Sequence, residues 1–169
     1  MKKLMLSVFA LAAVVFSASA DKSATATGSA SLIDIISIAK VDDLSFGQIT
    51  LGTGIGTLTL TPTATGEIGT PSVVGTGYTL LDGITRQAAK FHVVGEASKH
   101  YAITLPETLP LSGNSEGVEI TTFNTVSVAS NSLDEAGLGD FYVGGSLTIP
   151  DVCEAGTYTA DFSVTVAYD

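Results

Sequence analysis

The chain has 169 residues, including 18 Gly, 22 Thr and a single Cys, and only 14% of its residues are charged. This length is that of one domain, and the low charge with many β-branched residues excludes a disordered chain. One Cys excludes an intramolecular disulfide and a Cys-rich zinc site. The formal net charge of −10 excludes the basic surface that nucleic-acid binding needs.

Residues 1–20 have the pattern of a secretory signal peptide. Two lysines precede an apolar run at residues 4–16, and Ala-Ser-Ala at 18–20 matches a small-residue cleavage site. The alternative is an uncleaved membrane anchor, but the apolar run is short for a hydrocarbon layer of about 30 Å. We therefore expect an exported protein that begins at Asp21 and resides in the periplasm, at the cell surface or outside the cell.

Export would change the charge balance and the redox setting of the chain. Five basic residues then remain beside all 17 acidic ones, which gives a net charge of −12. Such a charge favours solubility and discourages edge-to-edge association of strands. In an oxidising compartment Cys153 is either a buried, inert thiol or a handle for an intermolecular bond.

Short strands are expected along the whole exported chain, because apolar residues alternate or form short runs bounded by Gly, Pro and Asn. The strands at 87–94 and 101–105 are expected to pair as a hairpin. About eight or nine strands with this spacing predict an all-β, antiparallel β-sandwich. The expected strands cover residues 32–40, 44–49, 56–60, 78–80, 87–94, 101–105, 118–129, 141–149 and 157–168.

The last expected strand has the clearest pattern. Its apolar residues alternate with Asp161, Ser163, Thr165 and Ala167, so one face of the strand is apolar and the other mostly polar. We expect the apolar face to pack on the core. That face consists of Ala160, Phe162, Val164, Val166 and Tyr168.

This C-terminal pattern resembles the last strand of chaperone–usher pilus subunits. Those subunits end in alternating apolar residues, with a penultimate Tyr and a Gly fourteen positions from the end. Here Tyr168 is penultimate and Gly156 is fourteenth from the end. Spore-coat-protein-U-like secreted domains have a similar ending.

More of the chain is similar to a family of secreted bacterial proteins known as domain-of-unknown-function family 4402. The resemblance implies an immunoglobulin-like β-sandwich over residues 33–169 and offers no catalytic residues. The matching pieces occur in order: LSFG at 44–47, GTLTL at 56–60, FHVVG at 91–95, YAITLP at 101–106, LD at 133–134, FYVGGSL at 141–147 and AGTY at 155–158.

The pilin resemblance implies assembly by strand donation, in which the N-terminal extension of one subunit fills a groove of another. The candidate donor is the extension 21–32, and the alternatives are a disordered tail or an in-chain first strand. The implied partners are other copies or related subunits, a periplasmic chaperone and an outer-membrane usher. Unlike many pilins, this chain has no disulfide near the start of the fold. The predicted assembly residues are Ala24, Ala26, Gly28, Ala30 and Leu32 on one face of the donor, with Gly156, Phe162, Val164, Val166 and Tyr168.

The sequence predicts no catalytic, cofactor-binding or metal-binding residue. His92 and His100 are the only histidines, and no Cys or carboxylate spacing near them suits a tetrahedral metal site. The chain lacks a G-x-S-x-G turn, and the Gly-rich run 52–56 lacks the Lys and the helix of a phosphate-binding loop. Its acidic pairs form no D-x-D-x-D-G calcium loop.

Two functions of different classes remain. We expect a non-catalytic structural subunit of a surface filament or coat, built by strand donation. The alternative is a self-contained exported β-sandwich that binds a glycan or a protein partner. The absence of Trp weakens the glycan alternative, because sugars stack on large aromatic side chains.

Overall fold

The computed structural model describes residues 22–169, so the predicted signal peptide and Asp21 lie outside the described residues. The chain divides into residues 1–32 and a compact unit, Ile33–Asp169. The described part of the first unit, 22–32, forms neither helix nor strand, and its side chains are exposed. No helix within 22–169 is long and apolar enough to cross a membrane.

The compact unit contains eleven strands and, within the described residues, no helix. Every strand pairing is antiparallel, which confirms the predicted all-β, antiparallel sandwich. Two of these strands were not expected from the sequence: the five-residue β4 and the two-residue β8. The strands are β1 (Ser37–Asp42), β2 (Ile49–Thr50), β3 (Thr53–Leu60), β4 (Ser72–Thr76), β5 (Thr79–Leu80), β6 (Ala89–Val94), β7 (Tyr101–Thr104), β8 (Leu109–Pro110), β9 (Glu119–Ser127), β10 (Leu138–Ile149) and β11 (Thr165–Tyr168).

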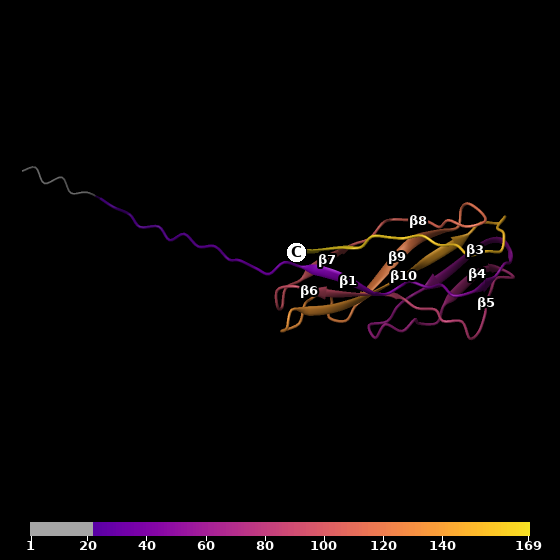
Figure 1. The fold of residues 1–169 in the computed structure, drawn as a ribbon, viewed down its shortest axis with the longest axis horizontal. Helices are drawn as coiled ribbons and strands as arrows, with labels where there is room; N and C mark the ends of the chain where they lie inside the picture. The colour runs from indigo at the N-terminus through magenta and orange to yellow at the C-terminus, as the bar shows by residue number, and fades with distance from the viewer. Residues whose placement is uncertain (1–21) are drawn as a thin grey trace, which may run out of the picture. The chain divides into compact units, whose positions relative to one another are not determined.

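Strand β10 organises the largest sheet (Figure 1). The first half of β10 pairs with β6 and the second half with β3, while β9 runs along the other edge. The partner changes at Gly144 and Gly145. A Cβ on Gly144 would collide with the carbonyl oxygen of Leu60, and one on Gly145 would lie 2.7 Å from that of Thr122. Glycine is therefore needed there, because the backbones of β3 and β9 approach β10 too closely for a side chain.

The hairpin predicted for residues 87–94 and 101–105 is wrong. Strand β6 has β1 on one edge and β10 on the other, so it offers no edge to β7. Instead β7 pairs with β11 in a separate two-stranded sheet. The rings of Phe91 on β6 and Tyr101 on β7 both contact Phe141, with centroid distances of 5.2 and 6.4 Å. The two consecutive strands thus pack through the core rather than edge to edge.

The first and last predicted strands are shorter than expected. β1 starts at Ser37, and residues 157–164 make only an isolated bridge, between Thr159 and Ser112, before β11 begins. The predicted alternation of the last segment is confirmed from Phe162 onward, where even-numbered residues are half-buried and odd-numbered residues exposed. Ala160 is an exception, because it is exposed. The pattern therefore identified the buried face but not the extent of backbone pairing.

The core consists of two clusters of buried side chains. Phe123 packs against both of them, and Phe162 packs against the second. The first cluster contains Leu58, Leu60, Tyr78, Val118, Ile120, Leu147 and Ile149. The second contains Ala89, Phe91, Val93, Tyr101, Leu133, Phe141 and Val143.

Candidate functional site

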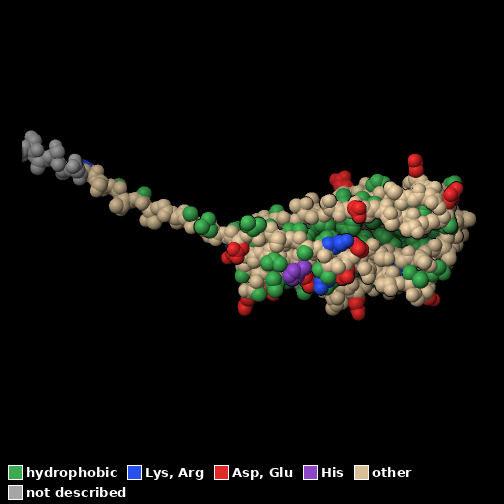
Figure 2. Space-filling model, in the orientation of Figure 1, with side chains coloured by type: hydrophobic (Ala, Val, Ile, Leu, Met, Phe, Trp, Pro, Cys, Tyr) green, Lys and Arg blue, Asp and Glu red, His purple; other side chains and the backbone are tan. Residues whose placement is uncertain are grey.

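An apolar cleft of about 810 Å³ opens between residues 44–51 and residues 153–162. Figure 2 shows hydrophobic side chains lining a hollow on this face of the molecule. The two bounding segments are the walls of the cleft, and its floor is the first core cluster. The floor is formed by Leu109, Leu111, Val118, Ile120, Leu147 and Ile149.

The backbones of both walls turn unpaired groups toward the cleft. On one wall the backbone of Ser45 forms two hydrogen bonds with the backbone of Gln87, of 2.9 and 3.0 Å. Because backbone groups alternate in direction along an extended chain, the N–H and C=O groups of Leu44 and Phe46 point the other way, into the cleft. On the other wall Thr159 exchanges two bonds with Ser112, of 2.9 and 3.0 Å. The backbone N–H and C=O groups of Tyr158 and Ala160, on either side of Thr159, therefore also face the cleft. Among the described residues, no backbone hydrogen bond joins the two walls.

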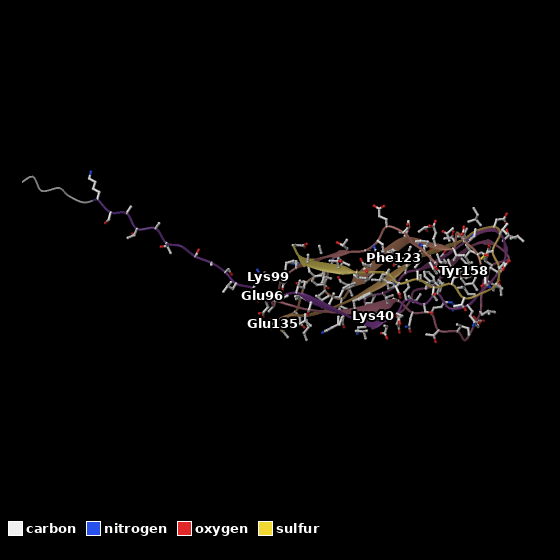
Figure 3. The ribbon with its side chains drawn as sticks, turned by 45° about the horizontal axis from the view of Figure 1, so that its top comes forward. Lys40, Glu96, Lys99, Phe123, Glu135 and Tyr158 are labelled. Carbon is white, nitrogen blue, oxygen red and sulfur yellow. The ribbon has the colours of Figure 1, made fainter. Side chains whose placement is uncertain are left out.

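The cleft has two different ends, which we call inner and outer. At the inner end, the ring of Phe162 contacts those of Phe91 and Phe123, at centroid distances of 6.4 and 5.1 Å. This contact closes the cleft against the second core cluster. At the outer end lies Tyr158, whose hydroxyl donates to the Glu154 carbonyl at 2.7 Å. Figure 3 shows Phe123 near the middle of the body and Tyr158 displaced toward one end.

The half-buried thiol of Cys153 also lines the outer end of the cleft, 3.4 Å from the Tyr158 hydroxyl. Gly156 follows it closely, where a Cβ would lie 2.6 Å from the side-chain nitrogen of Asn114. Asn114 in turn donates to the Ala155 carbonyl at 2.9 Å. Glycine at position 156 therefore lets this loop fold tightly around Asn114. A bond from this thiol to another chain stays a prediction, as does the alternative of an inert thiol.

The predicted assembly residues fall in three places. Phe162 and Gly156 line the cleft. Val164, Val166 and Tyr168 continue the same wall but pack on the second core cluster, outside the cleft. The donor residues Ala24, Ala26, Gly28, Ala30 and Leu32 are exposed in the first unit.

Sequence reasoning missed the wall formed by residues 44–51 and the floor of the cleft. The alternating pattern LSFGQI at 44–49 carried a signal for a half-buried strand. The pattern does not show which edge of that strand lacks a partner, because backbone pairing depends on segments far away in the sequence.

Tyr168 ties the C-terminal strand to the start of the compact unit. Its hydroxyl accepts the N–H of Glu96 at 2.6 Å and donates to the carbonyl of Asp34 at 3.0 Å. We expect Tyr168→Phe to lower the free energy of unfolding by about 1–2 kcal/mol, because both bonds are lost while the ring remains. Urea denaturation would measure the change. Tyr101→Phe is the control, since that hydroxyl has no hydrogen-bond partner among residues 22–169, and an equal loss in both variants would contradict the prediction.

The histidines do not meet in a common site. His92 lies on β6 with Nδ1 2.7 Å from Oδ1 of Asp140 on β10, and Nζ of Lys90 lies 3.1 Å from Oδ2 of the same carboxylate. Because a carboxylate only accepts, Nδ1 of His92 carries the hydrogen. The backbone of His100 instead forms an isolated antiparallel β-bridge with that of Ser132. Residues 22–169 contain no group of three or more His, Cys, Asp and Glu side chains that would hold a metal ion.

Asp140 makes the free energy of unfolding depend on pH in the acid range. Partial burial by itself raises the pKa of Asp140, but the hydrogen bonds from His92 and Lys90 outweigh burial and lower the pKa below its usual value. A carboxyl with a lowered folded pKa contributes stability above its unfolded pKa of about 3.9 and loses it as the pH falls through the folded value.

We therefore expect Asp140→Asn to lower the free energy of unfolding at pH 7 by up to about 1 kcal/mol and to have less effect near pH 2. Urea denaturation across this pH range measures both. Asp82→Asn is the matched control, because Asp82 forms no salt bridge among the described residues. An effect of Asp140→Asn that does not change with pH would contradict the prediction.

The sequence family described as Domain of unknown function (DUF4402) matches residues 36–168. The matched span contains both walls and the floor of the cleft. Neither the curated proteins nor the solved structures contain a match to this chain. The similarity to chaperone–usher pilins therefore stays a prediction, whereas the resemblance to domain-of-unknown-function family 4402 is confirmed over most of the chain. The chain belongs to the DUF4402 family.

Proposed function

We propose that this protein is a non-catalytic, exported structural subunit that assembles by β-strand donation, with the cleft as the acceptor. The observation that carries the proposal is an apolar cleft whose two walls both turn unpaired backbone groups toward it. A strand inserted there would pair with both walls and place alternate side chains on the floor. An open core and two free edges penalise the isolated subunit, so they favour a donor.

The N-terminal segment is long enough to be the donor. At about 3.3 Å per residue, the eleven residues 22–32 extend to about 36 Å, whereas the wall formed by 44–51 is about 26 Å long. The segment forms no strand of its own in the described structure. Its period-two face of small residues fits between two strands, with Leu32 as its one large side chain.

The same length argues that the donor comes from another copy. The hydrogen bonds of Asp34 to Glu96 and Tyr168 fix the start of the compact unit. From there to Leu44, where the cleft wall begins, the chain spans up to about 33 Å at about 3.3 Å per residue. A segment folded back from Ile33 would use nearly its whole length before entering its own cleft. Each copy therefore donates its segment to the cleft of the next copy, and a chaperone would cover the free edges before assembly.

The donor is expected to hold mainly through its backbone. Each net hydrogen bond contributes about 1 kcal/mol, and each buried CH₂ about 0.8 kcal/mol. Ala24, Ala26 and Ala30 offer one methyl each, so they leave part of the apolar floor unfilled. A weak donor of this kind implies assemblies that exchange subunits.

Deleting residues 21–31 tests the proposal. The exported full chain is expected to form concentration-dependent oligomers in size-exclusion chromatography with light scattering. The deletion variant is expected to fold, because all eleven strands follow Ile33, and to remain monomeric. A synthetic peptide of residues 21–32 should raise the melting temperature of the variant. The control peptide carries Ala26→Asp and Ala30→Asp.

The result that overturns the proposal is a full chain that stays monomeric at high concentration and a melting temperature that the peptide does not change. The alternative, a self-contained binding module, predicts that outcome. It also predicts that removal of residues 21–31 leaves the oligomeric state as it was.

A further inference from the structure

We propose that the bodies of successive copies also contact each other, through an apolar collar on one copy and an apolar rim on the next. The collar consists of Ile33 and Ile35. The rim consists of Leu51, Ile55 and Val152. The proposal rests on the proposed strand donation and adds a second contact, made by residues outside both the donor segment and the floor of the cleft.

The collar is exposed and held in a fixed place. Ile35 is 90% exposed and Ile33 is 49% exposed. Asp34, between them, donates its N–H to a carboxylate oxygen of Glu96 at 3.2 Å and accepts a bond from the Tyr168 hydroxyl at 3.0 Å. These two bonds anchor the backbone to the body, so the two isoleucines are presented to solvent by an ordered segment. Neighbouring large aliphatic side chains held in water favour a contact that covers them.

The rim lies beside the outer end of the cleft, which Leu51 and Cys153 line. Val152 is 85% exposed and Ile55 is 67% exposed. Leu51 is 41% exposed and lines the cleft itself. The loop of Val152 is tied to the start of β3, because the side chain of Asp151 accepts the N–H of Gly54 at 2.7 Å. The rim is therefore an ordered apolar border at the place where an inserted strand would leave the cleft.

The collar and the rim lie at opposite ends of the compact unit. Figure 1 shows the start of β1 and the C-terminus at one end, and β3 and β4 at the other. Figure 3 likewise shows Glu96, which binds Asp34, far from Tyr158 at the outer end of the cleft. One copy therefore cannot join its own collar to its own rim. A contact between opposite ends of successive copies generates a head-to-tail assembly, which is an open chain unless the rotation between copies closes it into a ring.

The place where the donor leaves the cleft brings collar and rim together. Leu32 is the last residue of the donor and Ile33 the first of the compact unit, so no linker separates the donor from the body that follows. At the inner end, that body would have to begin over Phe162 and the packed strands beyond it. At the outer end the acceptor stops, which leaves room for the next body. The donor then runs antiparallel to 156–162, and the collar emerges beside the rim.

Intermolecular cross-linking tests the contact. The full-length sequence carrying Cys153→Ser, Ile35→Cys and Val152→Cys is expressed with its leader, and the exported product is oxidised after assembly. We expect a ladder of covalent multimers on non-reducing gels. The matched control replaces Val152→Cys by Val41→Cys, because Val41 is also exposed (52%) but lies on β1, away from the rim. We expect no ladder from the control.

A second measurement does not depend on cysteines. Ile33→Ser with Ile35→Ser leaves residues 21–32 and the cleft unchanged and is expected to speed dissociation of the assembly by about tenfold or more. If the cysteine variant assembles without forming the cross-link, and the serine variant dissociates at the natural rate, the contact between collar and rim is overturned. Strand donation is then unaffected. The absence of any assembly in the exported chain without substitutions overturns both proposals.

Discussion

Assemblies of the Ala26→Val, Ala30→Val variant are expected to dissociate about 100-fold more slowly than those of the natural chain. Each substitution adds two carbon atoms to the donor face that would meet the apolar floor in the proposed assembly. At about 0.8 kcal/mol per buried CH₂, the two together contribute about 3 kcal/mol, and each 1.4 kcal/mol changes an equilibrium tenfold. Most of such a change falls on the dissociation rate. Dilution of labelled assemblies, followed by fluorescence, measures that rate.

The donor offers a control on its opposite face. Thr25→Val and Thr27→Val change side chains that point away from the floor when the other face is inserted. They are expected to leave the dissociation rate within about threefold of its natural value, since their side chains stay in solvent. Equal slowing by both pairs of substitutions would show that the segment does not enter the cleft as a strand with one buried face.

Phe141→Ala is expected to lower the free energy of unfolding by about 3–5 kcal/mol. Phe141 is 0% exposed and stacks on Phe91 with a ring-centroid distance of 5.2 Å. Its removal deletes a large apolar surface and leaves a cavity between β6, β7 and β10. A loss of this size is a substantial part of the 5–15 kcal/mol by which a typical domain is stable. Urea denaturation measures it.

Comparison of Phe162→Ala with Phe141→Ala distinguishes the contribution of the cleft from that of the core. Phe162 is only half-buried, so we expect a smaller loss of stability than for Phe141→Ala. Because the ring also forms the inner end of the cleft, the variant is expected to weaken binding of the 21–32 peptide. Phe141→Ala should affect the peptide little at temperatures where the variant stays folded. A larger stability loss from Phe162→Ala than from Phe141→Ala would contradict the account of the core.

The sequence by itself determined the fold class and the family. Period-two patterns such as Phe162, Val164, Val166 and Tyr168 reveal which face of a strand is buried, because successive side chains point to opposite faces. The family could be identified because its matching segments occur in order along the compact unit. The sequence also predicts the donor face, formed by alternate residues of 24–32.

Only the tertiary structure decided which strands pair and which edges stay free. The hairpin expected between 87–94 and 101–105 does not form, because β1 and β10 occupy both edges of β6. The cleft is likewise a property of two segments about a hundred residues apart, 44–51 and 153–162. Side-chain periodicity is local and records burial, whereas backbone pairing at an edge depends on which distant segment arrives beside it.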